Sequence, residues 1–235
     1  MSPWFPHWDL GGTTLLVETD QGPVLVDTGL GLRDHTHPTR MVRLFSADFG
    51  VRHDLATIAL NQVRRLGIAP EAVRHIVMTH LHFDHAGGLP DFPHAQVHLH
   101  AREHQAILRP RGWIDMAYDS SDFAHQPRWV QYEQVDCLWM GFQAIRLPFS
   151  PEMYLIPLFG HTRGHCGVAI KDEGRWVFHC GDALPTNAEF DLTPHWINRL
   201  VLGPHVPRLK EWSASHPEVQ VLAGHMWRSF FEEGG

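Results

Sequence analysis

Four residues that bind metals in proteins lie within six consecutive positions of this sequence. They are His80, His82, Asp84 and His85. Neutral imidazole nitrogens and carboxylate oxygens are ligands of zinc and of other divalent transition metals. The apolar residues 76–78 precede this group and the paired glycines 87–88 follow it, so we expect the group to lie where a buried strand ends. The sequence therefore predicts a metal site at that strand end.

Four more candidate ligands follow other strand-like runs, each near a glycine, and they are Asp27, His161, Asp182 and His225. Two divalent ions about 3.5 to 4 Å apart can share a carboxylate and a hydroxide, and they need ligands from several parts of a chain. Two ions need roughly six or seven ligands, a number that these candidates supply and that is too many for one tetrahedral ion. We therefore predict that the chain binds two zinc ions, or two other divalent transition metals.

Strands and helices alternate around these residues. The runs 13–19 and 24–29 predict a hairpin, and Asp54 is placed to cap a helix that ends at Gly67. A second unit of this kind is expected as a strand at residues 95–100 followed by a helix at residues 101–108. The later elements are expected as strands at 142–147, 154–158, 167–170, 176–179 and 219–222 and as a helix at 206–215.

The segment 111–140 has no clear periodicity but is rich in aromatic residues. Because it is too apolar for a disordered linker, we expect a long, partly helical excursion near the pocket. Its large side chains are expected to form an apolar wall of the cleft, a homodimer contact or a satellite core, with Trp4, Phe5 and Trp8 as additions. The residues concerned are Trp113, Tyr118, Phe123 and Trp129.

Composition restricts the class of protein. With 235 residues, 43% of them apolar, the chain is long enough for one filled core, and we expect a single domain over residues 1–235. The formal charge of -7 without a run of Lys or Arg argues against a nucleic-acid partner, and no apolar stretch approaches a membrane span. The three cysteines form no CxxC pair and the first residues do not resemble a signal peptide. We expect a cytoplasmic protein with a small-molecule substrate.

The spacing His80-x-His82-x-Asp84-His85, followed by His161, Asp182 and His225, resembles the metallo-β-lactamase superfamily. The resemblance covers nearly the whole chain, including residues 26–29. It implies an α/β fold, the αββα sandwich of two mixed β-sheets flanked by helices, with the site at one edge of the sheets. It also implies a division of the ligands, in which the first metal takes His80, His82 and His161, the second takes Asp84, His85 and His225, and Asp182 bridges the two.

Within this superfamily the chain looks most like the N-acyl homoserine lactonase group. The shared features are the sequence motif at residues 80–88, the helix end at residues 66–70 and the helix start at residues 101–103. Asp182 argues against the β-lactam hydrolases, which typically carry Cys or Ser as the bridging residue. Only ten residues follow His225, where glyoxalase II continues into a helical glutathione-binding domain. The resemblance implies a zinc hydrolase of a small ester or lactone, in which a hydroxide bridging the metals is the nucleophile.

One departure from the lactonases concerns the substrate. They commonly carry a tyrosine three residues after the bridging aspartate, whereas this chain has Pro185. Asp84 is then the expected catalytic proton carrier, which takes a proton from the nucleophile and passes it to the leaving group. Candidates for the missing hydrogen bond to the substrate are Tyr118, Tyr154 and His195. Asp27 is expected to support the site by hydrogen bonding, and His165 to lie behind the metal ligands or in the core.

Three other functions remain open from the sequence. One is hydrolysis of a thioester or a phosphodiester by the same fold. Another is an iron-dependent sulfur dioxygenase, which would bind one metal through His80, His161 and Asp182 and would be identified by iron content with oxygen consumption. The third is a non-catalytic ligand-binding member, identified by full metal loading without turnover.

Overall fold

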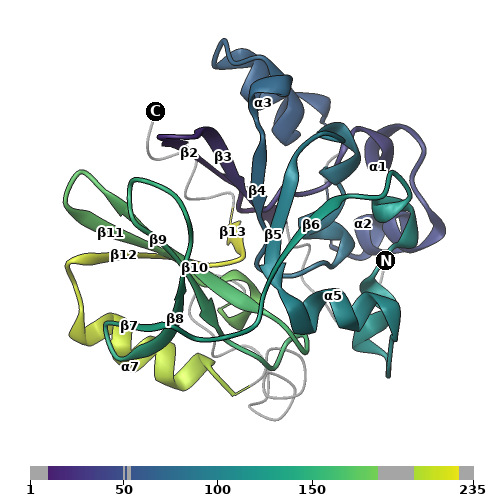
Figure 1. Cartoon of the computed structure of the whole chain (residues 1–235). Coiled ribbons are helices and arrows are strands. Elements are labelled where there is room, and N and C mark those ends of the chain that lie inside the picture. The colour runs from purple at the N-terminus through teal and green to yellow at the C-terminus, as the bar shows by residue number, and fades with distance from the viewer. Residues whose placement is uncertain (1–9, 50, 52–53, 185–203, 228–235) are drawn as a thin grey trace.

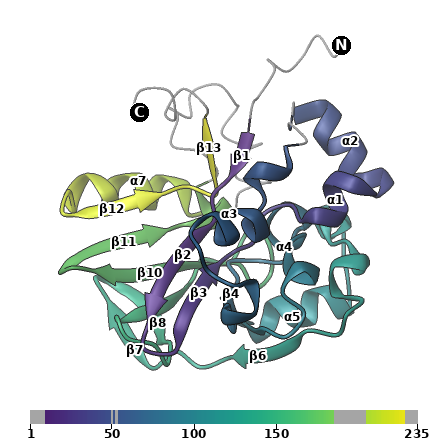
Figure 2. The same ribbon diagram turned by 90° about the horizontal axis from the view of Figure 1, so that it is seen from above.

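The computed structural model describes residues 10–49, 51, 54–184 and 204–227. Within these residues two β-sheets lie face to face, and helices cover their outer sides (Figures 1 and 2). The predicted αββα sandwich is therefore confirmed. None of the described helices is both long enough and apolar enough to cross a membrane.

The first sheet is built by the earlier part of the chain. Its five strands lie side by side in chain order, and they are β2 (Leu15–Thr19), β3 (Gly22–Val26), β4 (His75–Val77), β5 (Gln96–His100) and β6 (Arg128–Tyr132). β2 and β3 form the predicted hairpin, and β3 to β6 are parallel. Because parallel strands end at the same edge of a sheet, the segments that follow β3, β4 and β5 all leave from one edge.

The second sheet has six strands in the reverse order of the chain. They are β7 (Cys137–Trp139), β8 (Phe142–Arg146), β9 (Met153–Pro157), β10 (Cys166–Asp172), β11 (Arg175–His179) and β12 (Val219–Leu222). β11 and β12 are parallel, and the other neighbours are antiparallel. β9, β11 and β12 therefore end at the same edge. A separate pair of antiparallel strands joins β1 (Leu10–Gly12) to β13 (His225–Trp227).

Alternation along the strands of the first sheet divides the core into two layers. Val24 and Val26 face the second sheet, where they pack in one cluster with Leu155 and Val168. Leu25, between them in sequence, faces the opposite way and packs with residues of α3 (Ala59–Arg65). A strand whose two faces are both covered has few positions for polar side chains, which explains the near-continuous apolar runs of the sequence.

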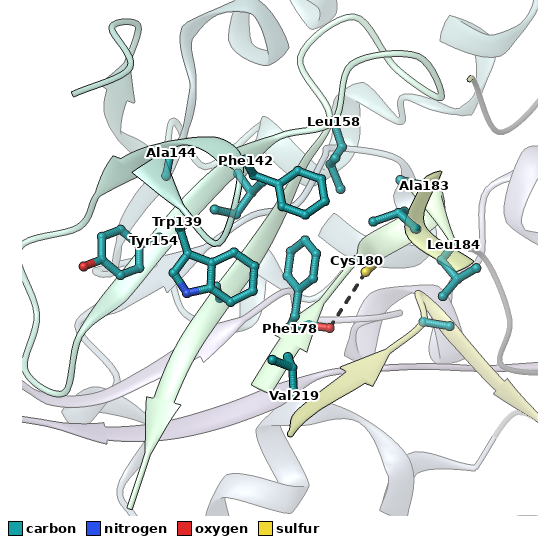
Figure 3. Packing of buried hydrophobic residues seen from close by; sticks show 14 of the residues in the cluster. Trp139, Phe142, Ala144, Tyr154, Leu158, Phe178, Cys180, Ala183, Leu184 and Val219 are labelled. Carbon is teal, nitrogen blue, oxygen red and sulfur yellow. Dashed lines mark hydrogen bonds between the residues drawn. The ribbon is translucent and has the colours of Figure 1, made fainter. Parts of the chain in front are cut away.

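The outer face of the second sheet is covered by α7 (Val206–Ser215), as predicted. Trp139, Phe142 and Phe178 form an aromatic layer there, and the ring centroids of Trp139 and Phe178 are 4.9 Å apart (Figure 3). Trp212 of α7 closes this layer, 5.3 Å from the Phe142 ring. Large aromatic side chains stabilise such a contact chiefly by the apolar area that they bury.

Short helices complete the fold near the edge where the strands of the first sheet end. They are α1 (Leu32–Thr36), α2 (Arg40–Phe49), α4 (Phe83–Ala86) and α5 (Ala101–Leu108). The position of α5 confirms the predicted helix after the fifth strand. The helix predicted from Asp54 to Gly67 is interrupted, because Ile58 is extended (ψ 145°) and separates a 3₁₀ turn at residues 55–57 from α3. The Asp54 side chain still accepts the Ala56 N–H at 2.9 Å.

The segment 111–140 is more regular than predicted. It contains two 3₁₀ turns, over residues 114–117 and 120–123, and it then forms β6 and β7. The strand β6 pairs in parallel with β5, so this segment completes the first sheet. The expectation of a long excursion was wrong here, because Trp129 and Tyr132 extend a sheet whose pairing partner is not visible in a local sequence pattern.

A buried histidine lies between the two sheets. His98 of β5 is 2% exposed, and its ring contacts Phe149 at 5.2 Å between centroids. Its Nε2 lies 3.0 Å from His75 Nδ1, and its Nδ1 lies 2.9 Å from the Tyr132 hydroxyl. Burial, together with the neighbouring His75, lowers the pKa of His98 from 6.5 to about 4.

This buried histidine predicts that the protein loses stability in mild acid. Between pH 6.5 and about 4 the unfolded chain binds a proton at residue 98 and the folded chain does not. The free energy of unfolding should therefore fall as the pH falls through this range, by up to about 3 kcal/mol from this group. Urea unfolding of the metal-loaded protein at pH 7 and pH 5 measures the fall. In His98→Gln the fall should be smaller, and an unchanged fall would contradict the assignment.

Candidate metal centre

The structure brings all seven predicted ligands together in two adjoining groups. The first group is His80, His82 and His161, and the second is Asp84, His85, Asp182 and His225. Within each group one candidate ligand atom per residue lies within 4.8 Å of all the others. The groups themselves are in contact, since the rings of His80 and His85 are 4.1 Å apart. The resemblance implied the same two sets but made Asp182 a bridge between them, whereas this grouping places Asp182 with the second set.

Each ligand lies just beyond the end of a strand, or in β13 at the same edge. His80 and His82 lie in the loop after β4, and Asp84 and His85 lie in the short helix α4. From the second sheet, His161 follows β9 and Asp182 lies in a 3₁₀ turn after β11. His225 opens β13, shortly after β12. The centre therefore lies where the ends of both sheets meet.

The carboxylate of Asp182 lies between the two groups. Its Oδ2 is 3.4 Å from His161 Nε2, in the first group. Its Oδ1 is 3.2 Å from His85 Nε2 and 3.4 Å from His225 Nε2, in the second group. A glycine makes room for this carboxylate, because a Cβ at Gly224 would lie 2.1 Å from Asp182 Oδ1. One carboxylate thus presents an oxygen atom to each group.

The polar atoms of the two groups fit a metal better than they fit one another. Several are buried without a hydrogen-bond partner, and these are His80 Nε2, His85 Nε2 and Asp182 Oδ1. A buried polar atom without a partner costs free energy, and a bound metal ion would supply the missing partner. Two ligands of one tetrahedral zinc ion lie about 3.3 Å apart, which is close to the distances around Asp182. The groups can therefore hold divalent metal ions.

The protonation of the histidines in the two groups is consistent with metal binding. Burial, with neighbouring histidines, holds the pKa of His80 and of His82 well below its usual value, so both rings are neutral, the form that binds metal. Burial also lowers the pKa of His85, but the nearby carboxylates, Asp182 first, raise it well above its usual value. The second group therefore favours positive charge at its centre, which a divalent cation supplies.

Asp27 supports this centre from behind. Its Oδ1 accepts the Thr79 N–H, its Oδ2 accepts the Thr79 hydroxyl, each at 2.7 Å, and Oδ2 lies 2.9 Å from His85 Nδ1. Burial raises the pKa of Asp27, but hydrogen bonds from His179 and His85 lower it overall, so the carboxylate is ionised. The backbone of Asp27 is left-handed, with φ 54°, which costs energy in a residue other than glycine. Because Asp27 contacts the Nδ1 atom of His85, the ring is oriented with its Nε2 atom toward Asp182.

His165 supports Asp182 rather than joining either group. Its Nε2 accepts the Asp182 N–H at 3.0 Å, and its Nδ1 lies 3.2 Å from the Leu158 carbonyl oxygen. Burial, the largest effect, lowers the pKa of His165 to about 3, so the ring is neutral. The proton is therefore on Nδ1, where it is donated to Leu158. Held in this way, His165 fixes the backbone that carries the Asp182 carboxylate.

The candidates for a hydrogen bond to the substrate lie in different places. The ring of Tyr118 is 5.1 Å from that of His82, and its hydroxyl donates to Glu103. Tyr154 is not brought to the centre, because it packs in the cluster beneath α7 and its hydroxyl contacts Glu152 and Arg146. In Figure 3, Tyr154 and Ala183, the residue after Asp182, lie at opposite ends of the drawn cluster. His195 and Pro185 lie outside the described residues, as do Trp4, Phe5 and Trp8.

The aromatic residues of segment 111–140 do not act as one surface. Phe123 and Trp129 are partly buried and pack against the core on the outer side of the first sheet, with ring centroids 5.8 Å apart. Tyr118 belongs to the same cluster and reaches His82. Trp113, in contrast, is 53% exposed. Phe123 and Trp129 therefore extend the main core on this side of the first sheet and do not form a separate satellite core.

Two buried residues of this region were not predicted from the sequence. Glu103 of α5 is 0% exposed and lies behind the first group. His179, at the end of β11, is also 0% exposed, and its Nε2 lies 3.4 Å from Asp27 Oδ2. His179 has a local signal, because it directly precedes Cys180-Gly181-Asp182, whereas the sequence places Glu103 only in a helix start.

The sequence is also similar to those of known proteins. The family model described as the metallo-beta-lactamase superfamily matches residues 7–225. The chain belongs to the metallo-β-lactamase superfamily. A probable metallo-hydrolase of Mycobacterium tuberculosis is 42% identical over 177 residues, which are 72% of this chain and 56% of that protein. An N-acyl homoserine lactonase of Bacillus thuringiensis is 34% identical over 166 residues, 67% of this chain and 57% of that enzyme. The match thus spans little more than half of these relatives.

Solved structures of this superfamily have the same fold. An N-acyl homoserine lactone hydrolase with N-hexanoyl-L-homoserine bound at its catalytic metal centre superposes with a TM-score of 0.65 at 22% identity, over 94% of this chain and 83% of that one. A dizinc quorum-quenching lactonase superposes with a TM-score of 0.61 at 18% identity, over 92% and 73% of the two chains. At these identities the likeness shows the fold alone.

Proposed function

We propose that this superfamily member is a dinuclear zinc hydrolase that acts on a small ester or lactone. The observation that carries the proposal is the Asp182 carboxylate, which presents one oxygen to each of the two ligand groups. Relatives named N-acyl homoserine lactonase and probable metallo-hydrolase support the reaction class. The lactone is the first substrate to test because those lactonases align over 67% of this chain.

The residues of the centre would divide the work of hydrolysis. Two divalent ions bound here would supply hydroxide at neutral pH, by lowering the pKa of water to about 7, and would polarise the substrate carbonyl. Asp84 would take the proton of the nucleophile and deliver it to the leaving alkoxide. Its side chain is the most exposed of the second group, at 13% against 10% for His225 and Asp182, and its Oδ2 lies 3.5 Å from His225 Nε2. That exposure suits a group that must reach the substrate.

The completeness of the second group favours a hydrolase over a mononuclear dioxygenase. A dioxygenase would need only His80, His161 and Asp182, and would give no role to the buried, unpartnered Nε2 atom of His85 or to the Nε2 atom of His225 beside Asp182. The Tyr118 hydroxyl already donates its proton to Glu103, so it does not supply the substrate contact that the lactonase tyrosine makes. Thioesters and phosphodiesters therefore belong in the same substrate panel as lactones.

Metal content is the first test. After reconstitution with zinc, elemental analysis should give close to two ions per chain, because seven ligands in two groups exceed the needs of one tetrahedral ion. A value that stays at one would remove the dinuclear proposal. Iron in the native protein, with oxygen consumption, would favour the dioxygenase instead.

The substrate panel is the second test. The zinc-loaded protein should hydrolyse an ester or an N-acyl homoserine lactone faster than a thioester or a phosphodiester. Full loading with no turnover on any of them would indicate a ligand-binding protein. The cytoplasmic location and the homodimer expected from the sequence remain proposals, and light scattering of the purified protein tests the homodimer.

A further inference from the structure

Glu103 is a fully buried carboxylate that accepts four hydrogen bonds from three separate segments. Its Oε1 accepts the Leu81 N–H and the Tyr118 hydroxyl, both at 2.9 Å. Its Oε2 accepts the Thr162 hydroxyl at 2.6 Å and the Gly164 N–H at 3.0 Å. A carboxylate satisfied in this way is held rigidly, and it holds its donors in turn.

Two of these segments carry the three-histidine group. Leu81 lies between His80 and His82, and Thr162 directly follows His161. One carboxylate therefore joins the loop from the first sheet to the loop from the second. Across this junction His161 Nε2 lies 3.0 Å from His82 Nδ1, so the two loops meet at the ligand atoms themselves.

The second loop is also seated on the helix that carries Glu103. A Cβ at Gly164 would lie 2.1 Å from the Glu103 nitrogen and 2.6 Å from its Cα, so only glycine allows this approach. The first turn of α5 thus limits how closely the loop of His161 can approach, and the Glu103 carboxylate binds that loop through Thr162 and Gly164. None of the four donors belongs to a residue of the Asp84, His85, Asp182 and His225 group.

We propose that Glu103 is a positioning residue that sets the distance between His161 and the His80 and His82 pair, and so the metal affinity of the three-histidine group alone. This inference rests on the proposed metal centre. The physical reason is that ligands held at the correct spacing before binding need no reorganisation when the metal enters. Partners behind the ligands commonly change metal affinity 10- to 100-fold.

The substitution Glu103→Gln tests the proposal with almost no change of shape. An amide has one acceptor oxygen, and its NH2 group can only donate. Whichever way the amide turns, that NH2 group meets the N–H of either Leu81 or Gly164, and neither N–H can accept. The hydroxyls of Tyr118 and Thr162 can turn to accept, so the loss falls on the backbone of one histidine loop.

The affinity of each group is measured separately in two backgrounds. His225→Ala leaves the three-histidine group complete, and His82→Ala leaves the four-residue group complete. Each protein is loaded with zinc and titrated with a competing chelator. Adding Glu103→Gln should weaken zinc binding about 10- to 100-fold in the His225→Ala background and less than about 3-fold in the His82→Ala background.

Matched variants separate positioning from general damage. Asp115 is another buried carboxylate beside this loop, which binds the Arg163 side chain at 2.9 Å, and Asp115→Asn should leave zinc affinity unchanged in both backgrounds. Thr162→Val removes one donor to Glu103 and should weaken only the three-histidine group, whereas Thr162→Ser should restore its affinity. The Thr162 pair gives the answer even where Glu103→Gln fails to fold.

Other outcomes would overturn the inference. An equal loss of affinity in both backgrounds would mean that Glu103 serves the fold as a whole, and no loss in either would mean that it has no effect on the ligands. Zinc binding that is absent from both backgrounds while Glu103 is intact would overturn the metal centre itself, and this inference with it.

Discussion

Replacing Asp84 by asparagine is expected to lower kcat at least about 100-fold, the lower end of what a positioned acid–base group contributes. An asparagine amide can neither take the proton of the nucleophile nor return it to the leaving group. The three-histidine group does not include Asp84, so its metal should remain bound. Steady-state kinetics on the best substrate of the panel, together with the zinc content of the same sample, measures both effects.

The kinetics must be read at full metal loading, because Asp84 is also a candidate ligand. Asp119→Asn is a suitable control, since that carboxylate accepts hydrogen bonds from Ser121 and belongs to neither group. It should keep the kcat of the unmodified protein. A kcat near the original value in fully loaded Asp84→Asn would exclude Asp84 as the proton carrier and would leave bound water as the proton source.

Asp182→Asn is expected to weaken the binding of both metals. The carboxylate offers Oδ2 beside His161 and Oδ1 beside His85 and His225, whereas an amide has one oxygen and no negative charge. The substitution also removes the charge that raises the pKa of His85 and His225. Zinc retained during dialysis against a graded series of chelator concentrations should fall from two ions toward none.

His225→Ala provides the comparison, because His225 belongs to the second group only. It should release one zinc ion at low chelator concentration and keep the other. If Asp182→Asn gave the same one-ion release, the carboxylate would serve a single metal, and the bridging role would be wrong.

The seven candidate ligands were recognisable from sequence because their types and their places at strand ends are both local signals. His80, His82, Asp84 and His85 fall within one short segment, and a single strand end suffices to aim them. The α7 helix was equally visible, since its predicted bounds, Val206 to Ser215, are those of the structure. Such features depend on residues that are neighbours in the chain.

The features that sequence did not reveal depend on contacts between distant residues. Glu103 gains its importance from Leu81 and Thr162, 22 and 59 positions away. β6 was missed because its only strand partner in the first sheet is β5, across residues 101–127. Tyr154 was a reasonable candidate from its residue type, but alternation along β9 turns it toward α7. Nothing local to these residues carries that information.

The pairing of β1 with β13 joins the beginning of the chain to the last candidate ligand, so the two ligand groups become complete at different times during synthesis. Chains are synthesised from the N-terminus, so the ligands of the centre leave the ribosome one after another. The three-histidine group is complete once His161 has left the ribosome. The other group waits for His225, which is opposite Gly12 in the two-stranded sheet. A chain released between residues 182 and 225 lacks one candidate ligand of the second group, so loading of the second metal would mark a chain that has been translated past His225.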